Sequence, residues 1–292
     1  MTSVPNPLAP SLAAWYAGHG RDLPWRDPEC SAWGVLISEV MLQQTPVTRV
    51  LEPWRRWLAL WPSPADLAAA TPADVLRQWG RLGYPRRAVR LRLAALAIVT
   101  DHAGAVPSTP EELAALPGVG AYTAAAVAAF AFGRRVVVLD TNVRRVLTRT
   151  VTGEALPPPS LRAAERRLAE ALLPGEADAA VIWNQAAMEF GALICTVRAP
   201  GCDECPAASD CAWRQSGYPA DAFAAARRTQ TWAGSDRQAR GLILAALRAA
   251  PDGLPEQQAL TLVADPAQAR RAIAGLLADG LAARVGRRLT LP

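Results

Sequence analysis

Apolar residues recur every three or four positions along most of the chain, a spacing typical of helices with one buried face. Val136–Leu139 resembles a strand but is too short to found a sheet. The pattern therefore predicts an all-α fold. Helices are expected over residues 32–44, 51–60, 71–79, 88–102, 109–116, 121–132, 161–172 and 177–194, with a shorter helix and a polar loop within 11–26.

The composition changes after Trp213. Residues 214–236 are small and polar, which predicts a linker, and further helices are expected over 237–250 and 266–279. The tail that follows predicts two short strands joined at Gly286, so this last part resembles a winged helix. It carries eight arginines against four acidic residues, a net charge of +4, and both DNA contact and partner binding are open for it. We predict a main domain over 1–213, a linker over 214–236 and a small domain over 237–292.

Composition and charge narrow the class of protein. No apolar run reaches the length of a membrane span, and the first residues lack the basic-then-apolar pattern of a secretion signal. We therefore expect a cytoplasmic protein without membrane contact. The net charge is +5 and the isoelectric point about 9.3, which is consistent with a polyanionic partner. The sequence contains many arginines but no lysine, so no side-chain amine is available for Schiff-base chemistry.

A glycine hairpin precedes the helix expected over 121–132. Gly118 and Gly120 flank Val119, and a bare backbone allows its N–H groups to approach a phosphate closely. The positive end of the following helix points the same way and adds to the attraction. Asp140 lies beyond that helix, where it could return toward the hairpin or simply cap the next helix. On these residues alone, a phosphate site and a plain tight turn are both open.

Four of the five cysteines gather between residues 195 and 211. Cys195, Cys202, Cys205 and Cys211 form the run C-x6-C-x2-C-x5-C. A zinc site usually pairs its ligands in two close C-x2-C units that lie far apart in the sequence, and only one such unit occurs here. Four thiolates in one compact loop suit a [4Fe–4S] cluster better. We therefore predict that these cysteines bind a [4Fe–4S] cluster.

These motifs together resemble the endonuclease III superfamily of DNA base-excision glycosylases, over residues 11–213. The resemblance implies a two-lobed helix-hairpin-helix fold with an iron–sulfur loop. Six runs of residues narrow the resemblance further: LPWR at 23–26, SEVMLQQT at 38–45, LGYPRRA at 82–88, LPGVGAYTA at 116–124, LDTNVRRV at 139–146 and NQAAMEFGALIC at 184–195. With these runs the chain resembles the adenine DNA glycosylases most, which implies excision of adenine mispaired with 8-oxoguanine or guanine in double-stranded DNA by a nucleoid-associated monomer.

Excision of this kind needs two carboxyl groups in different environments, because one protonates the leaving purine and the other stabilises positive charge on the sugar. Glu39 lies in the apolar run GVLISEVML, where desolvation should raise its pKa; a half-exposed glutamate on a helix edge is the alternative. The resemblance makes Glu39 the general acid and the later activator of water. It makes Asp140 an ionised group facing the sugar, with Asn142 and Tyr122 bonding the sugar or its phosphate.

Tyr122 occupies the position at which strand-cleaving members of the superfamily carry a lysine, and this chain contains no lysine. The resemblance therefore implies a monofunctional glycosylase that leaves an abasic site. It also places Trp25, Arg26 and Glu189 on the adenine side of the pocket. Trp25 could equally be a core residue.

By the same resemblance, Gln44 and Tyr84 match positions of the family whose side chains wedge into the duplex beside the orphaned partner base. A planar amide and an aromatic ring can fill the vacated stacking space there. A solvated helix end and a surface aromatic are the alternatives. Arg86 and Arg87 follow Tyr84 closely. We expect them to contact phosphates, and a solvated pair of charges is the alternative.

The C-terminal part departs from the family pattern. Members usually end in a domain that resembles Nudix hydrolases and helps to read 8-oxoguanine, whereas the residues after Gly217 resemble a winged helix. Selectivity for 8-oxoguanine is therefore open. A thymine or uracil mismatch glycosylase and a non-catalytic iron–sulfur protein that binds damaged DNA are the alternatives. Glu39 within SEVMLQQT favours adenine excision, because protonating a purine ring nitrogen needs an acid. The presence of both Glu39 and Asp140 argues against a non-catalytic protein.

Overall fold

The computed structural model describes residues 6–227 and 232–292. The predicted linker over 214–236 therefore lies partly outside the described residues. The chain divides into two compact units, one built from 1–32, 108–110 and 120–228 and the other from 33–107, 111–119 and 229–292. Within the described ranges, no helix combines the length and apolar character needed to span a membrane.

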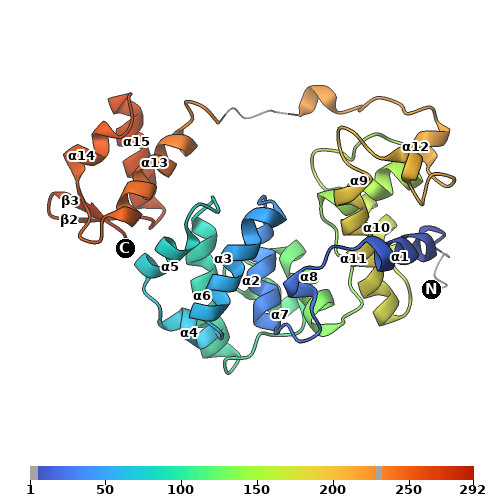
Figure 1. Cartoon of the computed structure of the whole chain (residues 1–292), viewed down its shortest axis with the longest axis horizontal. Helices are drawn as coiled ribbons and strands as arrows, with labels where there is room; N and C mark the ends of the chain where they lie inside the picture. The colour runs from blue at the N-terminus through green and yellow to red at the C-terminus, as the bar shows by residue number, and fades with distance from the viewer. Residues whose placement is uncertain (1–5, 228–231) are drawn as a thin grey trace. The chain divides into compact units, whose positions relative to one another are not determined.

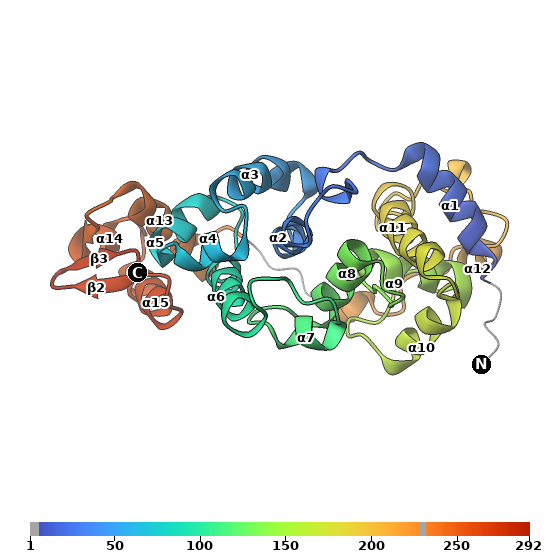
Figure 2. The same ribbon diagram turned by 90° about the horizontal axis from the view of Figure 1, so that it is seen from below.

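The first unit is helical (Figure 1). Helix α11 packs against both α1 and α9 (Figure 2), and the core between them buries Leu12, Val146 and Phe190. The elements of this unit are α1 (Leu8–His19), η1 (Pro24–Arg26), α8 (Ala121–Phe132), α9 (Thr141–Leu147), the π-helical turn η2 (Thr148–Thr152), α10 (Ala163–Leu172), α11 (Ala177–Leu193), η3 (Cys202–Glu204), α12 (Ala212–Gln215) and η4 (Ala224–Ala226).

The second unit begins with a group of helices whose core is rich in tryptophan. Trp57 meets Trp61 and Trp79 edge to face, with ring centroids 4.8 and 5.3 Å apart. The indole of Trp54 donates to the Gly34 carbonyl at 2.8 Å and so ties α3 to α2. The helices are α2 (Ala32–Leu42), α3 (Val47–Leu60), α4 (Pro64–Ala69), α5 (Pro72–Trp79), α6 (Arg86–Asp101) and α7 (Pro110–Ala115).

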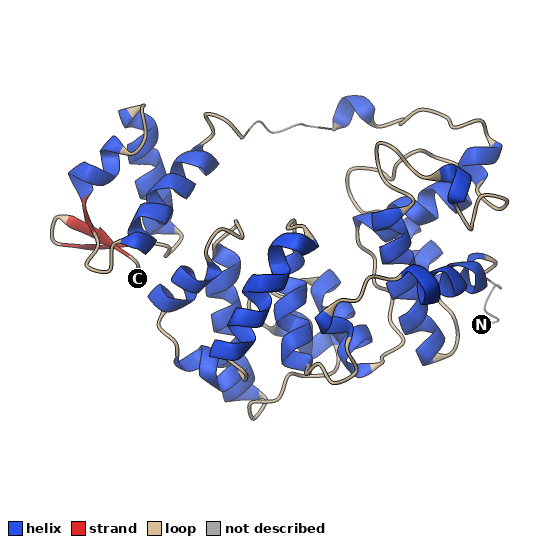
Figure 3. Ribbon diagram, in the orientation of Figure 1, coloured by secondary structure: helices blue, strands red, loops and turns tan. Residues whose placement is uncertain are grey.

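The C-terminal region, residues 232–292, completes the second unit. Its elements are α13 (Asp236–Ala249), β1 (Leu254–Pro255), α14 (Glu256–Thr261), α15 (Pro266–Ala278), β2 (Ala283–Val285) and β3 (Arg288–Thr290). The strands, drawn red in Figure 3, form an antiparallel sheet in the order β1-β3-β2, and α13 packs against α15. The predicted helices and tail strands are present. Sequence reasoning missed α14 and β1. A two-residue strand such as β1 has no periodicity and is defined only by its pairing with the distant Arg288 and Leu289.

The predicted all-α character is confirmed, since the described chain is mostly helical with its short strands in the C-terminal region. Val136–Leu139, which resembles a strand in sequence but was expected to be too short to found a sheet, is irregular and forms no strand. Its backbone bonds to the Asn184 side chain instead, which accepts from Val138 N at 3.3 Å and donates to Val136 O at 2.9 Å. The buried amide of Asn184 thus replaces a neighbouring strand.

Candidate active site

Glu39 is buried in α2 of the second unit. Its exposed fraction is 5%, and every residue of this helix from Trp33 to Met41 is buried. The alternative of a half-exposed glutamate on a helix edge therefore does not describe it. Burying a carboxyl group is costly, which makes Glu39 the second unit's candidate for proton chemistry.

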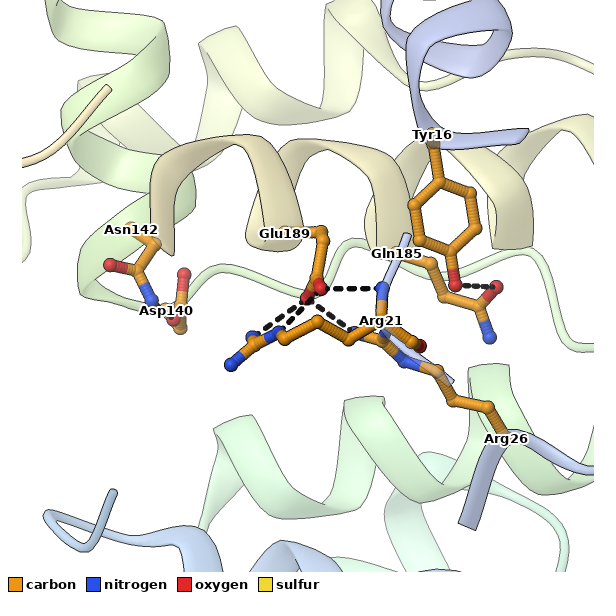
Figure 4. Close-up of polar contacts among 7 residues, drawn as sticks. All are labelled: Tyr16, Arg21, Arg26, Asp140, Asn142, Gln185 and Glu189. Atoms are coloured by element: carbon orange, nitrogen blue, oxygen red, sulfur yellow. Dashed lines mark hydrogen bonds and ion pairs between the residues drawn. The ribbon is translucent and has the colours of Figure 1, made fainter. Parts of the chain in front are cut away.

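Asp140 caps helix α9 in the first unit (Figure 4). Its Oδ1 accepts a hydrogen bond from Val143 N at 2.7 Å, and its Oδ2 accepts one from Asn142 Nδ2 at 2.8 Å. Burial raises the pKa of Asp140, and the donors from Val143 and Asn142 oppose this rise. The positive end of helix α9 also favours the ionised carboxylate and so acts against the effect of burial.

Asn142 is fixed by the contact between α9 and α11. Arg145 donates to Asn142 Oδ1 at 2.9 Å and also to the carbonyls of Cys195 and Gly191, at 2.6 and 2.5 Å. A Cβ at Gly191 would lie only 2.7 Å from Asn142 Cβ, so glycine permits this close approach. The amide that contacts Asp140 is therefore held by its own helix and by α11.

Glu189 on α11 binds two arginines from the segment between α1 and α2 (Figure 4). Its side chain is 1% exposed; Arg21 Nε lies 2.6 Å from Oε1, and Arg26 Nη2 lies 2.8 Å from Oε2. Burial alone raises the pKa of Glu189, but the hydrogen bonds from Arg21 and Arg26 outweigh it and lower the pKa to about 2. Glu189 is thus an ionised carboxylate at neutral pH.

Arg21 is a member of this group that sequence reasoning missed. It precedes the run LPWR and lies in a polar loop without periodicity, so no local signal indicated its partner. Arg26 was expected here, and its guanidinium also lies over the Tyr16 ring, 5.5 Å from the centroid. Trp25 is 6% exposed in η1, which fits the core interpretation as well as a place in the pocket wall.

The glycine hairpin has the conformation that its sequence requires. Gly118 has φ +81°, and a Cβ there would lie 2.6 Å from the Cβ of Arg90, so both backbone and space demand glycine. Val119 is buried, and Gly120 caps α8 without a side chain over the helix end. Tyr122 lies in the first turn of α8 and packs on the small cluster of Ala126, Ala129 and Val138.

Gln44 and Tyr84 are both exposed and share a left-handed backbone, with φ of +54° and +46°. Such a conformation is strained for residues other than glycine and persists only where the surroundings enforce it. Arg87 supplies that enforcement. It donates to Gln43 O at 2.6 Å and Gly83 O at 3.1 Å, which are the carbonyls immediately before the two strained residues.

The expectation that Arg87 contacts phosphate was wrong, because its guanidinium is committed to carbonyl groups of the protein. It also bonds to Val40 O and Met41 O at 2.8 and 3.0 Å and lies over the Trp79 ring. Burial lowers the pKa of Arg87 to about 10. Arg86 is exposed and forms an ion pair with Asp279 at 3.1 Å.

Replacing Arg87 by methionine should lower the free energy of unfolding by about 3 kcal/mol, because the carbonyls before Gln44 and Tyr84 lose their donor. The matched control is Arg86→Met, which removes an exposed ion pair and should cost less than about 1 kcal/mol. Urea denaturation of both variants measures the difference. Equal, small losses would show that Arg87 does not brace the two loops.

The four clustered cysteines line one pocket in the first unit. Burial raises the pKa of Cys195, whose Sγ accepts from Arg149 at 3.4 Å. Burial and the neighbouring thiols raise the pKa of Cys205 to about 11. Among the described residues, no set of three or more histidine, cysteine or acidic side chains stands as a ready-made site for one metal ion. Four free thiols around one pocket, beside a cation, are a donor set that fits an iron–sulfur cluster.

Comparison with known proteins shows to which family this chain belongs. Residues 37–172 match the HhH-GPD superfamily of base excision DNA repair proteins. The adenine DNA glycosylase of Mycolicibacterium smegmatis is 49% identical over 271 residues, which cover 92% of this chain and 90% of that protein. The chain belongs to the adenine DNA glycosylases. The Mycobacterium tuberculosis adenine DNA glycosylase is 48% identical over 97% of this chain and 92% of its own length.

A solved structure supports the same fold. A thermostable thymine-DNA glycosylase matches with a TM-score of 0.66 and 27% identity, over 72% of this chain and 95% of that one. The helix-hairpin-helix glycosylase fold expected from the sequence is therefore confirmed. As an adenine DNA glycosylase, the protein is a hydrolase of base excision repair that acts on DNA.

The polar groups described above lie at two places in the first unit and at two in the second. In the first unit, Asn142 donates a hydrogen bond to Asp140 at the start of α9. On the neighbouring α11, Glu189 forms ion pairs with Arg21 and Arg26. Within the second, Glu39 lies in α2, and Arg87 joins the two loops that carry Gln44 and Tyr84. Hydrolysis of a glycosidic bond uses carboxyl groups in different environments, so the buried acidic residues are the candidates for the chemistry.

Proposed function

We propose that this adenine DNA glycosylase is monofunctional, excises adenine mispaired with 8-oxoguanine or guanine, and leaves an abasic site. The observation that carries the proposal is that each unit offers one suitable carboxyl residue: Glu39, buried in α2, and Asp140, half-buried at the start of α9. A purine leaving group must gain a proton while positive charge develops on the sugar, so two carboxyl groups with different roles suit the reaction.

In the proposed reaction, Glu39 donates its proton to a ring nitrogen of the flipped adenine. The bond between the sugar C1′ and the base nitrogen then breaks, and the electron pair leaves with the protonated base. Asp140 stabilises the positive sugar, and the Glu39 carboxylate takes a proton from the water that adds to C1′. The sum is hydrolysis, in which Glu39 recovers its proton and free adenine leaves.

The absence of lysine from the sequence supports the monofunctional assignment. Strand cleavage by this superfamily uses an amine that attacks the sugar, whereas Tyr122 lies in the first turn of α8 here and a phenol forms no Schiff base. We assign Tyr122 and Asn142 to hydrogen bonds with the sugar or its phosphate. Asn142 suits this role because Arg145 and Asp140 already fix its amide.

The remaining site residues divide between base and backbone contacts. We assign Trp25, Arg26 and Glu189 to the adenine side, and Gln44 and Tyr84 to the space beside the orphaned base. The strained backbone of the last two supports a functional role, because strain persists where the surroundings over-determine a conformation. The hairpin residues Gly118, Val119 and Gly120 are assigned to a DNA phosphate through their N–H groups. The protein acts as a monomer on double-stranded DNA.

We infer that Cys195, Cys202, Cys205 and Cys211 hold a [4Fe–4S] cluster. The bound cluster would cross-link the loop over 195–211 to the end of α11. The purified protein should be brown, with broad visible absorption and four iron and four sulfide ions per chain. Zinc in place of iron, together with a colourless protein, would contradict the assignment.

Asp140→Asn should lower the single-turnover rate of adenine excision by about 10²–10³-fold, because the charge that stabilises the sugar is removed. Asparagine is as good an N-cap as aspartate, so the melting temperature should change little. Asp265→Asn is the matched control, since Asp265 caps α15 through Ala267 N at 2.8 Å. A rate for Asp140→Asn equal to that of the control would exclude the electrostatic role.

A panel of duplexes tests the specificity. The protein is incubated with DNA that contains A opposite 8-oxoguanine, A opposite guanine, T opposite guanine or U opposite guanine, and the strands are analysed with and without alkali. We expect loss of adenine from the first two duplexes, with breaks only after alkali. Loss of thymine or uracil with adenine untouched would overturn the proposal.

A further inference from the structure

The C-terminal region contacts the same loop that carries Tyr84. Residues 33–107 and the described part of 229–292 belong to one compact unit. Arg248 of α13 donates to Leu76 O of α5 at 2.9 Å, and burial lowers the pKa of Arg248 to about 10. Asp279, after α15, pairs with Arg86 at 3.1 Å and also with Arg240. The C-terminal region is thus attached at several points around the turn between α5 and α6.

Arg237 makes the contact that bears on function. Its Nη1 donates to the Tyr84 hydroxyl at 2.7 Å, and its guanidinium lies 5.3 Å from the centroid of the Tyr84 ring. The same guanidinium lies 4.8 Å from the centroid of Trp232. A planar cation that both bonds the hydroxyl and stacks on rings restricts the ring's orientation more than a point charge would.

Tyr84 therefore has supports of two kinds. Arg87 holds its backbone from within the unit, through Gly83 O, and lies 5.6 Å from the ring centroid. Arg237 holds the outer end of the side chain, which is otherwise 42% exposed. An exposed aromatic side chain with two freely rotating bonds gains little order from its own loop. Its orientation is thus set by a residue of the C-terminal region.

We propose that Arg237 is a positioning residue that orients Tyr84 for insertion beside the orphaned base, which makes the C-terminal region part of the discrimination between 8-oxoguanine and guanine. This inference rests on the proposed wedge role of Tyr84. It gives a function to a region for which sequence reasoning left DNA contact and partner binding equally open.

A double-mutant cycle tests the coupling. The variants are Arg237→Ala, Tyr84→Phe and the double variant, with Arg270→Ala as the control because Arg270 is an exposed arginine of α15 in the same region. The first readout is the ratio of single-turnover rates for adenine opposite 8-oxoguanine and opposite guanine. The second is the fluorescence of 2-aminopurine placed next to the orphaned base, which rises when a wedge unstacks it.

Arg237→Ala should lower the ratio of rates by about 3- to 10-fold and weaken the 2-aminopurine signal, with the melting temperature close to that of Arg270→Ala. Tyr84→Phe removes the hydroxyl and should lose a similar factor. The double variant should lose no more than the larger single loss, because both changes break one contact. Arg237→Lys should recover part of the ratio, since lysine keeps the donor and loses the planar stack.

Three outcomes overturn the inference. One is that the losses in the ratio of rates add up in the double variant. Another is that Arg237→Ala has the same ratio of rates and the same 2-aminopurine signal as Arg270→Ala. The third is a change only in the salt dependence of DNA binding, which would make Arg237 a plain phosphate contact. Tyr84→Ala separates the two proposals. If it excises normally, the wedge role of Tyr84 fails, whereas impaired excision with a normal Arg237→Ala rejects the positioning role alone.

Discussion

Replacing Glu39 by glutamine is expected to lower the single-turnover rate of adenine excision by about 10²–10⁴-fold, because glutamine has no proton to give to the leaving base. Glutamine matches glutamate in size and can keep hydrogen bonds, so the buried site in α2 should stay folded. The rate is measured with enzyme in excess over a duplex that contains A opposite 8-oxoguanine, and DNA affinity is measured by gel shift.

The control for this variant is Glu52→Gln. Glu52 lies on the exposed surface of α3 in the same unit, so its change removes one charge without touching a buried site. It should excise adenine at the rate of the unchanged protein. A Glu39→Gln protein that keeps its affinity and its rate would remove Glu39 from the chemistry.

The second large effect is expected at Glu189. Glu189→Ala should lower the free energy of unfolding by about 2–4 kcal/mol, because it leaves Arg21 and Arg26 without their shared carboxylate. The control is Glu170→Ala, which breaks an exposed ion pair with Arg135 at 3.4 Å and should cost about 0–1 kcal/mol. Urea denaturation gives both values. Similar small losses for the two variants would contradict a stabilising role for the Glu189 group.

The same group predicts a pH dependence. The pKa of Glu189 is lowered from 4.5 to about 2, so the folded state favours the carboxylate more strongly than the unfolded chain does. Its stabilisation is therefore fully present above pH 4.5 and is lost as the pH falls toward 2, a total on the order of 3 kcal/mol. The stability difference between the native protein and Glu189→Gln should shrink over this window. A difference that is constant with pH would contradict the assignment.

Local patterns predicted the parts of this structure that local physics determines. The helix expected over 121–132 is present as α8 with those bounds, because glycines at both ends and an apolar interior define it. Asp140 caps the next helix through Val143 N, as its position before that helix allowed. The helical fold and the family were also predicted correctly.

Contacts between side chains that are far apart in the sequence could not be predicted from the sequence. Arg21 lies in a loop without periodicity and finds Glu189 only after α1 and α11 pack together. Arg87 was expected to contact phosphate, yet its guanidinium binds the carbonyls of two neighbouring loops. Arg237 meets Tyr84 across 153 positions of sequence. The sequence alone does not indicate whether an arginine side chain contacts solvent, a phosphate or a buried carboxylate.

We expect the protein to hydrolyse the bond between adenine and deoxyribose and to leave the strand intact. Mass spectrometry of a duplex with A opposite 8-oxoguanine, taken after incubation without alkali, tests this directly. It should show free adenine and a full-length strand in which one hydroxyl replaces the base, with no adduct trapped when borohydride is present. A strand cut at that site, or a covalent protein–DNA adduct after borohydride, would contradict it.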